Sequence, residues 1–301
     1  MPNTVDTPAN SSATTSTVKQ HGSDRPILDI QNLTVSFDGF KALNDLNFSM
    51  RDGELRVIIG PNGAGKTTFL DVITGKVRPT TGQAYFKGRN LRHFSEHQIA
   101  RLGIGRKFQT PRVYLNLTPR ENLELSCNRS KGVFSTLLNQ PPSAERQTVR
   151  GLLDTIGLAA KADMQAALLS HGEKQWLEIG MLVAQSPDLL LVDEPVAGMT
   201  DEETERTGDL LISLAESHSV IVIEHDMEFV RQIARQVTVL HEGSVLCEGE
   251  CCPAMQYWRF LSTIHFPPLL LTHDIYLGRF LCAEPDAVFR LAKVRPAVLS
   301  R

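Results

Sequence analysis

The chain has 301 residues, of which 42% are hydrophobic and 22% charged, so it can form one large domain or two modest ones with a substantial core. Its formal net charge of −3 argues against a protein that coats nucleic acid, although it leaves a local phosphate site open. No run approaches the roughly 18–20 apolar residues that a membrane-spanning helix needs. The five cysteines lack metal-ligand spacing and are typical of free thiols in a reducing cytoplasm.

The N-terminal third begins with a polar tail and continues with strands. Residues 1–24 are low in complexity and contain no apolar segment of a secretory signal, so we expect them to be disordered. Two runs of alternating apolar residues follow, over Leu33–Phe37 and Leu46–Met50. The Asp38-Gly39 pair between them predicts an antiparallel hairpin.

The rest of the chain alternates between strand-like and helix-like patterns. The apolar run Leu55–Gly60 is typical of a buried parallel strand, and the helix after it should stop at Gly75. A short strand and turn are expected over 82–91, and a mostly helical insert over about 93–169. Beyond the insert, alternating elements imply a parallel sheet covered by helices. The helices should begin at Glu173, Asp201 and Met227, and the strands should lie over Asp188–Asp193, Ser219–Glu224 and on both sides of Gly243.

The segment "GPNGAGKTT" fits the phosphate-loop pattern and lies between a predicted strand and a predicted helix, as that pattern requires. Its glycines allow backbone N–H groups to turn toward phosphate oxygens, and the helix N-terminus adds a positive dipole end. Lys66 would reach the β- and γ-phosphates of ATP, and the Thr67 hydroxyl would bind Mg²⁺. The expected nucleotide-binding residues are Gly60, Pro61, Asn62, Gly63, Ala64, Gly65, Lys66, Thr67 and Thr68.

Acidic residues follow the apolar strand in "LLLVDEP", at the carboxyl end where parallel sheets bind ligands. Asp193 suits a role in holding Mg²⁺, and Glu194 is placed to accept a proton from an attacking water. His225 ends the next predicted strand, where it would contact the γ-phosphate or that water. The alternatives are an ordinary acidic strand end and a structural histidine. The phosphate loop in the same chain favours the functional interpretation.

Five ordered motifs between residues 27 and 249 resemble those of an ABC-transporter ATPase subunit. They are the Walker A loop Gly60–Thr68, the Q-loop glutamine Gln109, the signature "LSHGE" at Leu169–Glu173, the Walker B residues Asp193 and Glu194, and the switch histidine His225. The resemblance implies an α/β fold: a P-loop NTPase domain with a mixed central sheet, an N-terminal antiparallel β subdomain and a helical subdomain. It also implies hydrolysis of ATP with Mg²⁺, in which Glu194, His225 and Gln109 are the catalytic residues.

The resemblance assigns further roles residue by residue. Phe37 would stack on adenine, although an aromatic residue in an alternating strand fits the core equally well. Gln109 would join Thr67 and Asp193 at the Mg²⁺ site and transmit its state into the helical insert. Ser170 and Gly172 would contact the ATP held by an opposite subunit, because such ATPases close as head-to-tail dimers.

The segments "SHGEKQWLEIGM" and "EPVAGMTDEETERT" resemble the importer branch for branched-chain amino acids and urea, and look most like a urea-importer ATPase subunit. The implied partners are a second ATPase subunit, two transmembrane permeases and, indirectly, an extracytoplasmic substrate-binding protein, with no nucleic acid. The implied location is the cytoplasmic face of the inner membrane, reached only through the permeases. One alternative is the ATPase of a branched-chain amino acid importer. The other is a non-transport ABC ATPase, which usually carries a long coiled coil or two tandem cassettes.

The signature departs from the common LSGGQ, since His171 and Glu173 replace its first glycine and its glutamine. A carboxylate aimed at a phosphate is repulsive. The Ser170–Glu173 spacing, however, predicts a capping box in which Glu173 folds back to the Ser170 N–H. Thr200 replaces the usual D-loop aspartate, and its spacing from Glu203 predicts a second capping box.

The expected organisation is a tail at 1–24, an ATPase domain at 25–250 with its helical subdomain at about 93–169, and an atypical tail at 251–301. In the last segment only "IYLGR" resembles the short ending typical of this importer branch. A lineage-specific extension and a disturbed reading frame both explain the remainder.

Overall fold

A computed structural model describes residues 25–107, 112–127 and 143–250 of the chain. The tails predicted at 1–24 and 251–301 and the Q-loop residue Gln109 lie outside these ranges. Within the ranges, no helix combines the length and the apolar character needed to cross a membrane.

The N-terminal strands form an antiparallel sheet in the order β2-β1-β4-β5. The predicted hairpin is confirmed, because β1 and β2 pair so that Phe37 lies opposite Phe40. Asp38 and Gly39 make the turn between them with φ of 47° and 89°, a left-handed conformation that favours glycine. The bounds are β1 Leu28–Phe37, β2 Phe40–Met50, β4 Thr81–Phe86 and β5 Arg89–Asn90.

The second sheet has the order β10-β9-β3-β8-β7-β6 and is mixed, as predicted. Its strands pair in parallel except β10, which runs antiparallel to β9. Strands β3, β7 and β8 are buried at every residue, which explains their continuous apolar sequences. The bounds are β3 Leu55–Ile59, β6 Ile104–Lys107, β7 Leu189–Asp193, β8 Ser219–Ile223, β9 Gln236–His241 and β10 Ser244–Glu250.

Strand β6 is a departure from the sequence analysis, which expected a mostly helical insert over about 93–169. It lies inside that range, yet it pairs in parallel with β7 and forms one edge of the mixed sheet. The strand is only four residues long and ends in Arg106 and Lys107, so its sequence lacks the apolar run that identified the other strands. Helix α2 (Glu96–Leu102) precedes it, and the other helices of the insert follow it.

The helices occupy the positions expected from the sequence, with small shifts at their ends. The signature helix α6 begins at His171, two residues before the predicted start at Glu173, and α1 ends at Ile73, two residues before Gly75. The bounds are α1 Lys66–Ile73, α2 Glu96–Leu102, α3 Pro119–Cys127, α5 Ser143–Thr155, α6 His171–Val183, α7 Asp201–Leu214 and α8 Met227–Ile233.

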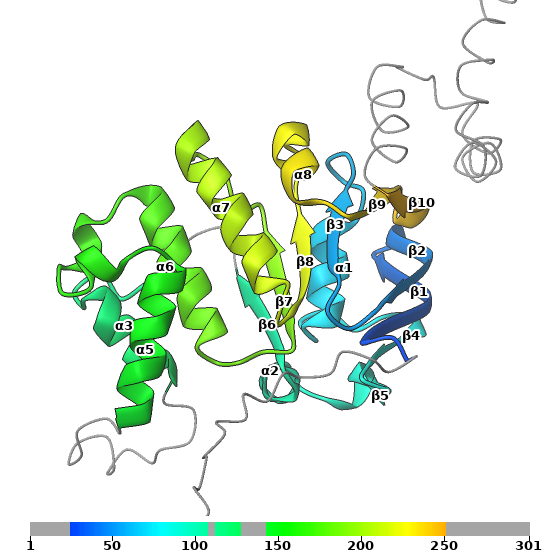
Figure 1. The fold of residues 1–301 in the computed structure, drawn as a ribbon. Coiled ribbons are helices and arrows are strands. Elements are labelled where there is room, and N and C mark those ends of the chain that lie inside the picture. The colour runs from blue at the N-terminus through cyan, green and yellow to red at the C-terminus, as the bar shows by residue number, and fades with distance from the viewer. Residues whose placement is uncertain (1–24, 108–111, 128–142, 251–301) are drawn as a thin grey trace, which may run out of the picture.

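The elements form layers around two apolar cores (Figure 1). One core joins the antiparallel sheet, α1 and one face of the mixed sheet, and the other joins the opposite face to α3 and α5–α8. Alternate residues of one strand serve both cores: Ile58 faces the first, while Val57 and Ile59 face the second. The mixed sheet is therefore covered on both faces, and its strand ends are left to form a site.

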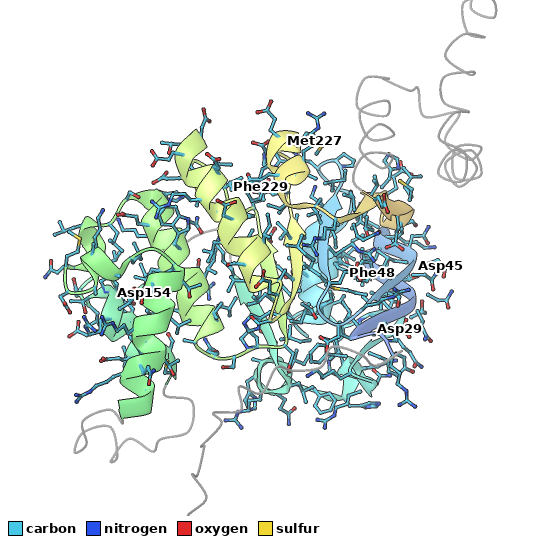
Figure 2. All side chains as sticks on the ribbon, in the orientation of Figure 1. Asp29, Asp45, Phe48, Asp154, Met227 and Phe229 are labelled. Carbon is cyan, nitrogen blue, oxygen red and sulfur yellow. The ribbon has the colours of Figure 1, made fainter. Side chains whose placement is uncertain are left out.

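Aromatic side chains mark the two cores (Figure 2). Phe48 of β2 packs edge-to-face on Phe69 of α1, with ring centroids 5.2 Å apart, in the core between the sheets. Phe229 of α8 belongs to the core on the other side of the mixed sheet. Helix α1, which follows the phosphate loop, is therefore anchored through its buried face.

Candidate functional site

The phosphate loop joins the carboxyl end of β3 to α1, as the sequence predicted. Lys66 folds back over the loop, and its ammonium group donates to the carbonyls of Gly60 at 2.6 Å and Pro61 at 3.0 Å. Burial lowers the pKa of Lys66, and the negative charges of Glu194 and Asp193 oppose that shift. The lysine and the two acidic residues therefore share one site.

Close packing explains two glycines of the loop. Gly65 has a φ of 96°, and a Cβ there would lie 2.5 Å from the carbonyl oxygen of Ala42 in β2. A Cβ at Gly60 would lie 2.4 Å from the carbonyl oxygen of Leu240 in β9. Gly63, by contrast, has a φ of 82° and nothing within 4 Å of an added Cβ. The base of the loop is thus held by both sheets, while its tip faces open space.

Asp193 ends β7 and is 5% exposed. Its Oδ2 accepts a hydrogen bond from Nη2 of Arg106 at 3.1 Å. Burial raises the pKa of Asp193, and the hydrogen bond and charge of Arg106 oppose that shift. The Asp193 carboxylate and the exposed hydroxyl-bearing Thr67 supply the oxygen ligands that Mg²⁺ prefers, so these residues fit that ion.

Glu194 and His225 occupy neighbouring strand ends. Glu194 has a φ of 46°, a backbone conformation that is uncommon outside glycine and concentrated at functional sites. Its N–H donates to the carbonyl of Ile223 in β8 at 3.0 Å, which supports this conformation. Nδ1 of His225 lies 3.7 Å from Oε1 of Glu194, close but beyond hydrogen-bond distance. The structure therefore brings together the two described residues that were predicted to be catalytic.

The buried side chain of Glu224, a residue that the sequence did not indicate, holds the backbone of the loops that carry Glu194 and His225. Its carboxylate accepts hydrogen bonds from the backbone N–H groups of His225 at 2.9 Å, Asp226 at 3.3 Å and Val196 at 3.4 Å. Burial raises the pKa of Glu224, and these hydrogen bonds oppose that shift. One buried carboxylate thus ties the loop after β7 to the loop after β8.

Both predicted capping boxes are confirmed. At the start of α6, Glu173 N–H donates to Oγ of Ser170 at 3.1 Å, and Ser170 N–H donates to Oε2 of Glu173 at 3.0 Å. Thr200 and Glu203 make the same pair of bonds at the start of α7. The carboxylate of Glu173 is therefore turned back onto its own helix end, as the sequence predicted.

A lysine offsets the negative charge of Glu173. The ammonium group of Lys161 lies 2.5 Å from Oε1 of Glu173. Burial raises the pKa of Glu173, but the hydrogen bonds from Lys161 and the Ser170 backbone outweigh it and hold the pKa below its ordinary value. The departure from LSGGQ thus introduces a carboxylate whose charge is already compensated.

A second carboxylate covers the signature segment. The Ser170 hydroxyl donates to Oε1 of Glu203 at 2.8 Å, and a Cβ at Gly172 would lie 2.6 Å from the Glu203 carboxyl carbon. In the described part of the chain, Ser170 bonds to the starts of α6 and α7 and makes no hydrogen bond with the loop Gly60–Thr68. The hydrogen bonds of Ser170 thus link the starts of two helices.

Phe37 is 48% exposed at the end of β1, so it is not a core residue. Phe40, its partner across the turn, is 67% exposed. The same strand β2 carries Ala42, whose carbonyl approaches Gly65 of the phosphate loop. Stacking of Phe37 on adenine stays a prediction, and the exposure of Phe40 adds it as a second candidate.

Sequence reasoning missed the residues whose partners lie far away in the chain. Arg106 pairs with Asp193, 87 residues later, and Ser170 pairs with Glu203, 33 residues later. The one local signal was the charged pair of Arg106 and Lys107 directly before the segment that contains Gln109. Two adjacent cations in a buried strand require buried anionic partners, but the strand itself was not recognised.

Comparison with known proteins agrees with this geometry. The family model described as "ABC transporter" matches residues 43–197. The high-affinity branched-chain amino acid transport ATP-binding protein LivG of Salmonella typhimurium is 35% identical over 234 residues, which cover 75% of this chain and 92% of that protein. The chain belongs to the ABC transporter family. BraF of Pseudomonas aeruginosa, a protein with the same description, is 34% identical over the same shares of both chains.

A solved structure extends the agreement to the fold. The dimeric post-hydrolysis state of an ATP-binding cassette bound to ADP and Pi superposes with a TM-score of 0.63 at 25% identity. The match covers 74% of this chain and 98% of that chain. The α/β ABC cassette fold predicted from the sequence is therefore confirmed, and the chain is an ATP-hydrolysing member of the family. The relatives' names refer to branched-chain amino acids, so they do not support the prediction of urea as cargo.

The paired carboxylate at the signature leads to a prediction. Glu173→Gln should leave ATP turnover within about twofold and bind ATP slightly more tightly, because the amide oxygen still caps Ser170 and a negative charge near phosphate is removed. Loss of the partly exposed ion pair with Lys161 should cost less than about 1 kcal/mol in the free energy of unfolding. Steady-state ATPase assays and denaturant unfolding measure both effects.

A matched control for this prediction is Glu121→Gln. Glu121 forms the same kind of capping pair with Thr118, at the start of α3 instead of the signature helix α6. The variant Glu121→Gln should leave both ATP turnover and ATP affinity unchanged. A large loss of activity in Glu173→Gln alone would show that this carboxylate takes part in the reaction.

Proposed function

We propose that this ATPase drives an importer of the branched-chain amino acid type. The observation that carries the proposal is the similarity to LivG and BraF over 92% of their length. The cargo would pass through other subunits, so no residue of this chain would contact it. The chain would supply the energy by binding and hydrolysing ATP.

In the proposed mechanism, each residue at the strand ends has a separate role in binding or hydrolysing ATP. Thr67 and Asp193, with Gln109, would hold Mg²⁺, which neutralises developing charge on the phosphates when bound. Lys66 would exchange its two loop carbonyls for phosphate oxygens, since its ammonium group already lies at the loop. Glu194 would accept a proton from the attacking water. His225, 3.7 Å away, would contact the γ-phosphate or that water.

The proposed active unit is a dimer of ATPase subunits. Ser170 and Gly172 would contact the ATP bound by the opposite subunit, and this is supported by the hydrogen bonds of Ser170, which go to the starts of α6 and α7. Two transmembrane permeases would receive the motion of the helical insert, and an extracytoplasmic substrate-binding protein would deliver the cargo to them. The ATPase would then lie on the cytoplasmic face of the inner membrane.

Urea is the second candidate cargo. It is favoured by the segments "SHGEKQWLEIGM" and "EPVAGMTDEETERT", which resemble the urea-importer ATPase more than the amino acid ATPases. Both segments lie at the signature and around the start of α7, in a chain that would not contact the cargo. These two segments therefore indicate how the chain is related to other ATPases of the importer branch, and the cargo must be identified by experiment.

Reconstitution separates the two cargoes. The full chain would be purified with the permeases encoded beside its gene, placed in vesicles with the matching binding protein, and tested for uptake of labelled leucine and labelled urea. We expect uptake of leucine that requires ATP and is lost with Glu194→Gln. Uptake of urea alone would transfer the assignment to the second candidate, and an ATPase that binds no permease would contradict the importer function.

A further inference from the structure

Arg106 joins two acidic side chains in the interior of the nucleotide site. Its Nη1 lies 2.5 Å from Oδ1 of Asp71, and its Nη2 lies 3.1 Å from Oδ2 of Asp193. The three side chains are only 7%, 12% and 6% exposed, respectively. Oδ2 of Asp71 also lies 3.4 Å from Nζ of the more exposed Lys76. A buried guanidinium held between two buried carboxylates is a rigid arrangement, because the planar group bonds to both in one orientation.

The three residues lie on three different elements of the nucleotide site. Asp71 lies on α1, five residues after Lys66, and Asp193 ends the Walker B strand β7. Arg106 lies on β6, three residues before Gln109. One side chain therefore connects the phosphate-loop helix, the Walker B strand and the strand that leads to the Q-loop segment.

The hydrogen bond with Arg106 occupies one of the two carboxylate oxygens of Asp193. Oδ2 accepts this bond from Nη2 of Arg106. Within the part of the chain that the structure describes, Oδ1 of Asp193 accepts no hydrogen bond from protein. A carboxylate clamped through one oxygen can rotate little, so its second oxygen points in a fixed direction.

We propose that Arg106 is a positioning residue for Asp193 and orients this carboxylate toward the magnesium ion of the nucleotide. The inference rests on the proposed role of Asp193 and extends it to a residue that touches neither metal nor nucleotide. Supporting side chains of this kind typically change metal affinity 10- to 100-fold when they are replaced. A lysine would compensate the charge but has no planar fork to hold two carboxylates in one geometry.

Metal-dependent nucleotide binding tests the proposal without relying on turnover. The full chain would bind a non-hydrolysable ATP analogue at rising Mg²⁺ concentration, and in parallel with EDTA in place of metal. For Arg106→Gln we expect the half-saturating Mg²⁺ concentration to rise about tenfold, with affinity in EDTA changed less than about threefold. Arg106→Lys should fall between wild type and Arg106→Gln.

The direction of the change in Mg²⁺ affinity distinguishes a positioning role of Arg106 from a simple effect of its charge. Removing a cation beside a metal site should, by Coulomb's law alone, tighten metal binding. Weaker binding of Mg²⁺ therefore indicates lost positioning, whereas unchanged or tighter binding would overturn the proposal. The control Asp71→Asn leaves the bond between Arg106 and Asp193 in place and should stay within about twofold of wild type.

Two further measurements keep the test decisive. If Arg106→Gln unfolds at a much lower temperature, the double variant Arg106→Gln/Asp71→Asn removes one of the two carboxylate charges that Arg106 compensates and should show the same rise in half-saturating Mg²⁺. A normal Mg²⁺ requirement in that folded double variant would also overturn the proposal. A wild-type chain that bound the analogue with no dependence on Mg²⁺ would instead refute the proposed metal site as a whole.

Discussion

Glu194→Gln should lower the rate of ATP hydrolysis by at least about 100-fold while leaving ATP binding intact, because a positioned general base contributes 10²–10⁴ in rate. The glutamine side chain has the same shape but cannot take the proton from an attacking water. The backbone support should survive, since it is the Glu194 N–H that donates to the carbonyl of Ile223. Phosphate release measures the rate, and binding of a fluorescent ATP analogue measures the affinity.

The same variant should accumulate the ATP-bound dimer, which size-exclusion chromatography with ATP would detect. Glu242→Gln is the matched control. Glu242 is also a glutamate with a φ of 46°, but it lies exposed in the turn between β9 and β10. It should hydrolyse ATP at the wild-type rate. Continued hydrolysis by Glu194→Gln would reject this residue as the base.

Local patterns in the sequence predicted much of the fold and the site. Continuous apolar runs identified β3, β7 and β8, because strands buried on both faces need apolar residues at every position. The Ser170–Glu173 and Thr200–Glu203 spacings predicted two helix starts, because a capping box is closed within four residues. Features whose physical cause lies within a few residues are visible in a single sequence.

Features whose cause lies in the tertiary structure were not visible. Strand β6 owes its conformation to pairing with β7, about 85 residues later, rather than to the composition of Ile104–Lys107. The same holds for side-chain contacts between distant elements. Arg106 donates hydrogen bonds to Asp71 and Asp193, and Ser170 donates one to Glu203, only because these elements pack together. Charged residues that the site uses indirectly are therefore the ones that sequence reasoning missed.

The contact between Ser170 and Glu203 changes the interpretation of the signature. The Ser170 hydroxyl now donates to Glu203, and Gly172 in the first turn of α6 lies against the same carboxylate. If the ATP of an opposite subunit binds there, Ser170 must exchange Glu203 for a phosphate oxygen. The capping box with Glu173 remains during this exchange, because it uses Ser170 Oγ as an acceptor and the Ser170 N–H as a donor, whereas the bond to Glu203 uses the hydroxyl hydrogen. The helix start thus stays formed while its ligand changes.

Ser170→Arg should therefore abolish ATP turnover while the single chain still binds ATP. The arginine side chain would extend over Gly172 and pair with Glu203, and so would fill the surface where the opposite subunit's ATP is proposed to bind. The phosphate loop and its Lys66 are built from other elements and should keep their affinity. Turnover by phosphate release and ATP binding by equilibrium dialysis would separate these two effects.

The loss of the helix cap is a separate cost of this substitution, about 1 kcal/mol in the free energy of unfolding. Ser95→Arg controls for it, because Ser95 starts α2 with the same kind of capping box, formed with Gln98. It should show the loss in stability and keep wild-type turnover. If Ser170→Arg also kept wild-type turnover, the signature would not contact ATP across a dimer. If both variants lost turnover equally, the effect would come from instability rather than from a blocked interface.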